Sequence, residues 1–266
     1  MELVDTHCHI HSADYGLDAD EVIRAAAAEG VTRLICVGTD LEDSRRAVEF
    51  ASNRDNCWSS VGIHPHEADR IIQKAHGREQ LKNFGKELGG GSKIVAVGEC
   101  GLDYYYNHSS KRAQAEVLRW QLEFALEHNL PLIFHIREAY ADFWSIFDEY
   151  YNRKRRVQGV VHSFSATRKD LDEILARDLY VGLNGIMTFI KQSKQPEQIE
   201  AAKMVPLRKL LLETDAPYLT PVPYRGKICE PKHARVTAEF LADLRGESLE
   251  RLATATTANA KQLFGL

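Results

Sequence analysis

The chain has 266 residues, of which 44% are hydrophobic and 27% are charged, and its formal net charge is −4. This composition is typical of a globular protein with a full core, and it excludes a disordered chain and a globally basic nucleic-acid binder. The five cysteines are scattered without a CxxC pair, which predicts reduced thiols in a cytoplasmic protein and excludes a disulfide framework.

Short aliphatic runs alternate with longer amphipathic stretches along the whole chain. No apolar run approaches the roughly 18 residues that a membrane span needs. The predicted strands are residues 3–7, 33–38, 59–64, 93–99, 130–135, 159–164, 179–185 and 209–215. The predicted helices include residues 18–30, 41–53, 114–129, 168–178, 231–246 and 248–264. Asp18 and Ser248 are predicted N-caps, and Gly30 and Gly246 follow predicted helix ends.

Eight β–α units that follow one another without a linker predict an α/β fold, a single (β/α)8 TIM barrel domain over residues 1–266. A doubly wound sheet is the alternative, but no glycine-rich phosphate loop follows the first strand. In a barrel, the carboxyl ends of all strands meet at one rim, and that rim carries the chemistry.

Metal-binding side chains stand at these predicted strand ends. In the opening stretch LVDTHCHIH, His7 and His9 point to the same side, because side chains alternate along a strand. Later strands end in Glu99, His135, His162 and Asp215. Imidazole and carboxylate groups are the ligands of Zn²⁺, Mn²⁺ and Mg²⁺. Each residue alone is more often an ordinary core or rim residue, but together they predict the metal centre of a hydrolase.

Two metal ions account for this set of ligands. The first would be held by His7, His9 and Asp215, and the second by His135 and His162. Glu99 would bridge the two, so Glu99 and Asp215 are the predicted catalytic carboxylates. Two ions roughly 3.5–4 Å apart can bring an attacking water and a phosphoryl or acyl oxygen together. Asp5 and Glu213 are predicted to support the ligands without binding metal.

Cations that follow strands are candidates for holding phosphates at the rim, namely Arg137, Lys191, Arg225 and Lys227. The run RKRR at residues 153–156 precedes the sixth strand, so it is predicted to be a solvated turn away from the rim. Loop aromatic residues are candidates for stacking on nucleobases, namely Tyr104, Tyr105, Tyr106, Phe164 and Tyr224.

Seven motifs resemble the TatD family of metal-dependent deoxyribonucleases, within the wider amidohydrolase-like superfamily. In chain order they are DTHCHIH, VGIHPHE, VGECGLDYYY, LPLIFHIREA, VVHSFSAT, LLLETDAPYLTP and EPKHA, and they run from Val4 to beyond His233. The resemblance implies a 3′ to 5′ exonuclease acting on the phosphodiester bonds of DNA. It also implies two divalent ions, with Mg²⁺ as the expected metal and Mn²⁺ or Zn²⁺ as alternatives. It supports the six ligands above and places His64 near the scissile phosphate.

Other activities fit the same site. An ester hydrolase acting on D-aminoacyl-tRNA would use the same two ions to polarise an ester carbonyl. The cations suited to phosphate disfavour a small-molecule amidohydrolase. The complete ligand set disfavours a metal-binding module that has lost catalysis. We expect DNA as the substrate, no membrane, no obligate protein partner, and a monomer.

Overall fold

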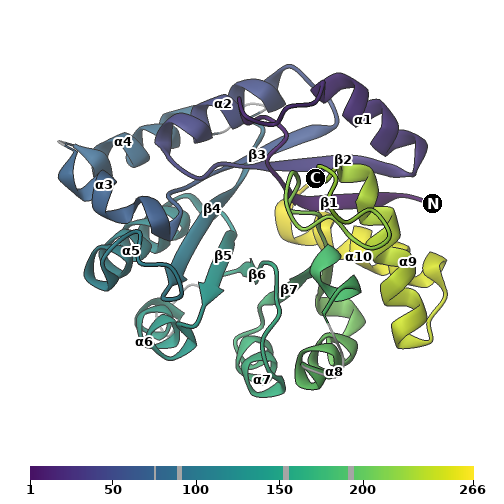
Figure 1. Ribbon diagram of the computed structural model, residues 1–266. Coiled ribbons are helices and arrows are strands. Elements are labelled where there is room, and N and C mark those ends of the chain that lie inside the picture. The colour runs from purple at the N-terminus through teal and green to yellow at the C-terminus, as the bar shows by residue number, and fades with distance from the viewer. Residues whose placement is uncertain (75, 89–91, 152–155, 191–194) are drawn as a thin grey trace. The chain divides into compact units, whose positions relative to one another are not determined.

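Strands and helices alternate along the chain as predicted (Figure 1). The computed structural model describes residues 1–74, 76–88, 92–151, 156–190 and 195–266. The described residues divide into two units. The first combines Met1–Cys36 with His162–Leu266, and the second is the continuous stretch Val37–Val161. Among the described residues, no helix is both long enough and apolar enough to cross a membrane.

The first unit contains a parallel sheet in the order β7-β8-β1-β2. β1 pairs with β2 in parallel, and β7 pairs with β8 in the same way. Past the end of β8, the Asp215 backbone N–H donates to the carbonyl of His7 at 2.8 Å, and the His9 N–H donates to the carbonyl of Ala216 at 2.7 Å. The strands of this unit are β1 (Leu3–Cys8), β2 (Val31–Val37), β7 (Tyr180–Leu183) and β8 (Leu210–Leu212).

The helices of the first unit follow its strands along the chain. They are α1 (Ala19–Ala28), α7 (Arg168–Ala176), α8 (Pro196–Met204), α9 (Ala234–Arg245) and α10 (Leu249–Phe264). The last of these, α10, packs against both β1 and β8. Asp18 and Ser248 accept hydrogen bonds from the first turns of α1 and α10, so both predicted N-caps are confirmed. Gly246 ends α9 with a φ of 65°, where glycine is the favoured residue.

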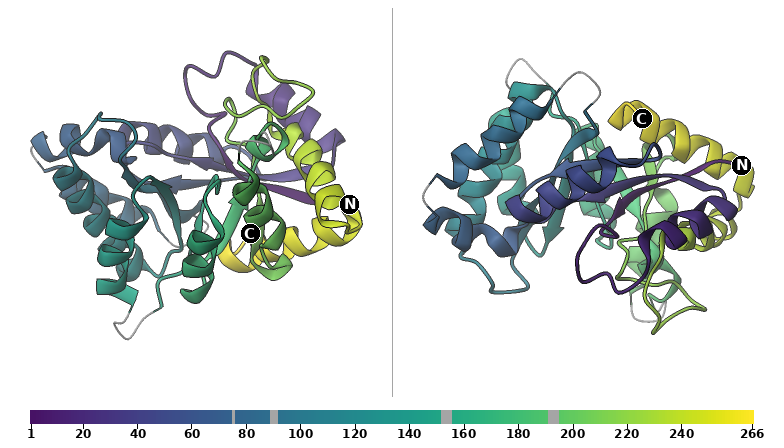
Figure 2. Two further views of the ribbon diagram at one scale, coloured as in Figure 1. Left: turned by 60° about the horizontal axis from the view of Figure 1, so that its bottom comes forward. Right: turned by 90° about the horizontal axis from the view of Figure 1, so that it is seen from above.

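The second unit contains the parallel strands β3-β4-β5-β6 in that order. They are β3 (Cys57–Val61), β4 (Ile94–Asp103), β5 (Leu132–Arg137) and β6 (Gly159–Val161). Its α-helices are α2 (Leu41–Ser52), α3 (Ala68–Gln73), α4 (Gly77–Asn83), α5 (Lys111–His128) and α6 (Tyr140–Tyr151). Within this unit, α2 packs on β3, α5 on β4 and α6 on β5, and α5 and α6 also lie side by side (Figures 1 and 2).

The strand bounds differ from the predicted ones by up to four residues. β3 ends at Val61 and β6 at Val161, so His64 and His162 follow their strands and do not close them as predicted. Two further differences change the site. β8 ends at Leu212, and the Glu213–Asp215 segment continues as irregular chain, because Asp215 has a φ of 62° that a strand does not accept. β4 continues four residues beyond the predicted end at Glu99. The extension runs to Asp103 and pairs with β5 through Asp103 and Arg137. The extra length brings a second carboxylate to the end of the strand.

Gly101 allows β4 and β5 to approach each other between the two carboxylates of β4. Its φ is 150°, and a Cβ at this position would lie 1.9 Å from the carbonyl oxygen of His135. No side chain fits there, because the neighbouring atom belongs to the backbone of a buried sheet. The glycine in the motif ECGLD is therefore a packing requirement.

We expect Gly101→Ala to lower the free energy of unfolding by about 3 kcal/mol, because it combines backbone strain with overpacking. Gly246→Ala is the matched control. Gly246 has a φ of 65°, in the left-handed region that alanine adopts at modest cost, and open space around it, so its loss is about 1 kcal/mol. Urea denaturation followed by circular dichroism measures both variants. Equal losses would show that the close approach to His135 is unimportant.

Candidate metal centres

His7, His9 and Asp215 form one cluster in the first unit. The Nε2 atoms of His7 and His9 lie 3.1 Å apart, and the Asp215 Oδ1 lies 3.5 Å from the first and 3.4 Å from the second. The two histidines are on β1 and directly after it, and the two backbone bonds between β1 and the 215–216 segment bring the aspartate beside them. Two imidazole nitrogens and one carboxylate oxygen, all within 4.8 Å of one another, fit a divalent cation.

The charge of Asp215 suits this role. Burial by itself disfavours the carboxylate, but a hydrogen bond to His9 and the nearby His7 and His162 rings outweigh burial. The net result is a lowered pKa for Asp215, so its carboxylate is ionised at neutral pH. An ionised carboxylate can bind a cation or accept a proton from water.

His162 lies with the first cluster as well. Its ring stacks on that of His7, with ring centroids 3.9 Å apart and an interplanar angle of 17°. The Glu213 Oε1 lies 3.4 Å from the His162 Nδ1 and accepts a hydrogen bond of 2.6 Å from the Ser163 N–H. The amide of Asn184 donates to the same oxygen at 3.2 Å. Glu213 thus connects the chain after β8 with His162, Ser163 and Asn184 of the same unit.

Asp5 lies in the core behind the first cluster. One oxygen accepts from the backbone N–H groups of His7 and Thr214, at 3.2 and 2.9 Å, and the other accepts from the Thr214 hydroxyl at 2.6 Å. Burial raises the pKa of Asp5 to about 8 in spite of these bonds. Its bonds connect the backbone on both sides of the cluster, so Asp5 fixes the distance between β1 and the chain after β8.

A second cluster lies in the second unit. Glu99 on β4 has its Oε1 2.8 Å from the Nδ1 of His135 on β5 and 3.6 Å from the Nε2 of His64, which follows β3. The three side chains offer atoms within 4.8 Å of one another. A carboxylate and two imidazoles again fit a divalent cation by the chemistry of their donor atoms. The predicted bridging role of Glu99 stays a prediction.

Both ring nitrogens of His135 face carboxylates, Nδ1 that of Glu99 and Nε2 that of Asp103. The His135 Nε2 lies 3.0 Å from the Oδ2 of Asp103. Burial disfavours a charge on Asp103, but hydrogen bonds from His135, the Tyr106 N–H and His66 lower its pKa well below the ordinary value. An ionised Asp103 only accepts, so the His135 Nε2–H donates to it, and Nδ1, which faces the Glu99 Oε1, is the ring atom that would bind a metal held by this cluster.

The hydrogen bonds of His64 lead to the opposite assignment. Its Nδ1 accepts from the backbone N–H of His66 at 3.2 Å. In the neutral ring the proton is therefore on Nε2, which faces Glu99 as a donor. This geometry suits a ring that donates to an oxygen of a substrate better than a metal ligand, although His64 lies within the cluster.

Two residues of this centre were not predicted, Asp103 and His66. His66 lies in a short 3-10 helix, Pro65–Glu67, and its Nε2 is 3.0 Å from the same Asp103 Oδ2 that His135 binds. Burial lowers the pKa of His66, which favours a neutral ring that donates to Asp103. The sequence does hold a signal for Asp103, since residues 99 and 103 share the parity of one strand.

The predicted substrate cations lie on both units. Arg137 at the end of β5 has its guanidinium 4.1 Å from the ring centre of Tyr105. Arg225 lies over Phe189 at 3.9 Å and donates to the Thr220 carbonyl at 3.1 Å. Phe164 is buried, so its predicted stacking on bases is wrong. Lys191 and residues 153–155 lie outside the described residues.

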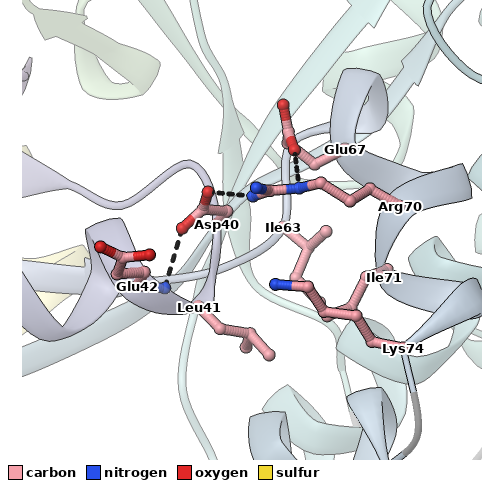
Figure 3. A pocket seen from close by; sticks show the side chains of 8 residues that line it. All are labelled: Asp40, Leu41, Glu42, Ile63, Glu67, Arg70, Ile71 and Lys74. Carbon is pink, nitrogen blue, oxygen red and sulfur yellow. Dashed lines mark hydrogen bonds and ion pairs between the residues drawn. The ribbon is translucent and has the colours of Figure 1, made fainter.

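A small polar pocket opens in the second unit, and no predicted metal ligand lines it (Figure 3). Arg70 points across it to the carboxylates of Asp40 and Glu67, with its Nε 2.6 Å from the Glu67 Oε2. Asp40 also accepts from the N–H groups of the first turn of α2. The charge of Arg70 is thus compensated, so this pocket is a poor binding site for a phosphate.

Comparison with known proteins identifies the family. The family model described as TatD related DNase matches residues 4–265. The chain is 38% identical to the uncharacterized metal-dependent hydrolase YabD of Bacillus subtilis, with 98% of each chain covered. It is 34% identical to the 3′-5′ ssDNA/RNA exonuclease TatD of Citrobacter rodentium, with 99% of this chain and 98% of the relative covered.

A solved structure supports the same assignment and the fold. The crystal structure of YjjV, a TatD homologue from Escherichia coli K12, matches with a TM-score of 0.88 and 27% identity, over 99% of this chain and 98% of that one. Together with the eight parallel strands of the described residues, this likeness confirms the predicted (β/α)8 barrel class. The predicted hydrolase of nuclease type is confirmed as well, and the chain belongs to the TatD family of metal-dependent DNases.

Proposed function

We propose that the protein is a divalent-metal-dependent exonuclease that removes nucleotides from DNA in the 3′ to 5′ direction. The observation that supports it most is the pair of histidine–carboxylate clusters at the carboxyl ends of strands, since phosphodiester hydrolysis commonly uses two metal ions. The names of relatives such as the exonuclease from Citrobacter rodentium favour a nucleic acid as the substrate.

In this proposal each of the two clusters binds one metal ion. His7, His9 and Asp215 would hold one ion, and Glu99 with His135 would hold the other; His162, whose ring stacks on His7, is a further candidate ligand. When bound, Mg²⁺, or Mn²⁺ or Zn²⁺ in its place, supplies Lewis acidity toward the phosphoryl oxygens and acidifies the attacking water. Asp215, ionised at neutral pH, accepts the proton of that water.

His64 has a different role in this proposal, in keeping with its hydrogen bonds. Its Nδ1 is occupied by a backbone N–H, so its Nε2–H donates to a phosphoryl oxygen of the substrate. Such a donor stabilises the negative charge that grows in the transition state. Arg137 and Arg225 bind the phosphates that flank the reacting one.

The test uses protein stripped of metal and reloaded with Mg²⁺, Mn²⁺ or Zn²⁺ in turn. The substrates are end-labelled single-stranded DNA, double-stranded DNA and D-aminoacyl-tRNA. We expect no hydrolysis without metal and stepwise shortening of DNA from its 3′ end with metal. Deacylation of the tRNA without shortening of DNA would overturn the nuclease assignment in favour of the ester hydrolase.

The binding of DNA by the rim cations gives a separate prediction. Replacing Arg225 and Lys227 by alanine is expected to raise the KM for DNA and to flatten its dependence on salt by about one unit of slope for each phosphate that the variant no longer binds. Arg208 and Lys209 are a charge-matched control, because they lie in a 3-10 helix at the amino end of β8. The measurement is KM against NaCl concentration for both double variants. A larger effect in the control pair would place the DNA at the opposite end of the strand.

A further inference from the structure

We propose that Tyr105, Tyr106 and Arg137 form a subsite that stacks an unpaired nucleobase and binds its phosphate; we call this set the tyrosine platform. The inference rests on the proposed nuclease function and adds the part of the substrate that this unit recognises. The platform lies at the carboxyl ends of β4 and β5, next to the second cluster.

The two tyrosines expose surface that a packing role would bury. Tyr105 is 52% exposed and Tyr106 is 42% exposed, although both are large aromatic residues. Their ring centres are 4.7 Å apart at an interplanar angle of 84°. The Arg137 guanidinium lies 4.1 Å from the first ring centre and 4.8 Å from the second. Exposed aromatic rings beside a cation are the usual elements of a single-strand binding surface.

The neighbouring Tyr104 shows what a structural tyrosine looks like in the same segment. It is half-buried, its hydroxyl donates to Asp142 at 2.8 Å, and the Lys111 ammonium lies 3.9 Å from its ring centre. That ring joins the loop to α5 and α6, whose residues supply both partners. Tyr105 and Tyr106 are instead exposed, with Arg137 as their cation, and the Tyr106 ring also stacks on that of His108, with ring centres 5.6 Å apart.

The platform is fixed before any substrate arrives. The Oδ1 of Asp103 accepts from the backbone N–H groups of both Tyr105 and Tyr106, each at 3.0 Å. The Tyr104 N–H donates to the carbonyl of Arg137 at 2.9 Å, so the cation and the rings share one backbone connection. A surface held in this way loses little conformational entropy on binding, which favours affinity.

The platform also lies close to His64, through the ring of His66. The Tyr106 ring centre lies 5.6 Å from that of His66, and the His66 ring centre lies 4.3 Å from that of His64. His64 is the donor proposed for the scissile phosphate. A base stacked on Tyr106 or Tyr105 therefore belongs to a nucleotide close to the reacting bond.

The chemistry of the platform selects a single strand over other ligands. Aromatic rings stack on any base, so the subsite is tolerant of sequence. The base must expose its face, which a base inside a duplex does not do because its neighbours cover both faces. Arg137 adds attraction for the phosphate of the same nucleotide. Single-stranded DNA or the frayed 3′ end of a duplex meets these requirements.

The experiment compares the wild type with the double variant Tyr105→Ala, Tyr106→Ala. Mg²⁺-loaded protein is titrated with fluorescent single-stranded phosphorothioate oligonucleotides, which resist cleavage. One oligonucleotide has all its bases, and each of the others lacks one base at one of the four 3′-terminal positions. We expect the wild type to lose affinity about five- to 150-fold when the stacked base is missing, and the variant to be equally weak for the complete and the abasic strand.

Two control variants separate stacking from other effects. Tyr105→Phe, Tyr106→Phe keeps the rings and is expected to bind like the wild type, which excludes a role for the hydroxyls. Trp58→Ala removes a matched aromatic–cation pair, with Lys93 4.7 Å from the ring centre, at the amino end of β3, and is expected to leave the affinity for both strands unchanged.

The outcomes for the platform and for the nuclease differ. If the double alanine variant binds the complete strand as tightly as the wild type does, the tyrosine platform is wrong, even if the protein digests DNA. If the wild type distinguishes complete from abasic strands at one position and the variant does not, the platform stands. In that case a failure to digest DNA overturns only the proposed activity.

Discussion

Replacing Glu99 by alanine is expected to lower turnover of DNA about 1000-fold or more while the fold is kept. A loss of about 4 kcal/mol of transition-state stabilisation gives a factor of this size, and removal of a ligand that holds a catalytic metal can cause it. Glu99 is buried on β4 with its carboxylate directed at His135 and His64, so its loss acts mainly on the cluster. The measurement is kcat on an end-labelled oligonucleotide together with metal content by mass spectrometry.

Two further variants serve as comparisons for this result. Glu99→Gln keeps the size of the side chain but removes its charge, so it is expected to be nearly as inactive as the alanine variant. Glu67→Ala removes a carboxylate of the same unit that pairs with Arg70 outside the cluster, and it is expected to retain turnover. Near-normal activity and full metal content in Glu99→Ala would show that this carboxylate is structural.

Replacing Asp103 by asparagine is expected to weaken metal binding in the second cluster about 10- to 100-fold. The aspartate accepts from the His135 Nε2–H and thereby leaves Nδ1, on the Glu99 side of the ring, as the nitrogen that would bind a metal. An asparagine can place its NH₂ group against Nε2, which then accepts and shifts the proton to Nδ1. The ring would keep its position and lose its ability to bind metal at Nδ1.

Two measurements check this prediction. Isothermal titration with Mn²⁺ gives the metal affinity, and ¹⁵N NMR of histidine in the metal-free protein gives the tautomer of His135 directly. The asparagine oxygen can still accept from the N–H groups of Tyr105 and Tyr106, so thermal stability should change little. Unaltered metal affinity with the Nε2–H tautomer still present would contradict the positioning role of Asp103.

The grouping of the candidate ligands was predictable because two regular patterns coincide in this fold. A buried parallel strand contains a short apolar run, and a histidine or an acid marks the end of that run, as at His135 near the end of β5 and at His162 directly after β6. The alternation of side chains then gives the shared direction of His7 and His9. Both patterns are local, so they can be read without knowing which strands are neighbours.

The residues beside His135, namely His66 and Asp103, were not predictable in the same way. His66 follows a proline in a 3-10 helix, so its spacing of two from His64 does not mean that both rings face the same direction as they would in a strand. Asp103 lies four residues past the apolar run of β4, and its place depends on the pairing with β5. Interactions between segments decide both cases, and the pattern within β4 shows only that Asp103 shares the parity of Glu99.

The first unit is assembled from the two ends of the chain, and this has a consequence for the newly synthesised protein. The backbone bonds that set Asp215 beside His7 and His9 join the start of the chain to a segment translated much later. Strand β1 is held in addition by α10, the last helix, where Thr257 donates to the Glu2 carbonyl and Lys261 pairs with the Glu2 carboxylate. A chain still on the ribosome contains His7 and His9 well before it contains Asp215 and α10, which support them. Hydrolytic activity should therefore arise only after these later segments have been synthesised, and chains that stop before Asp215 should be inert.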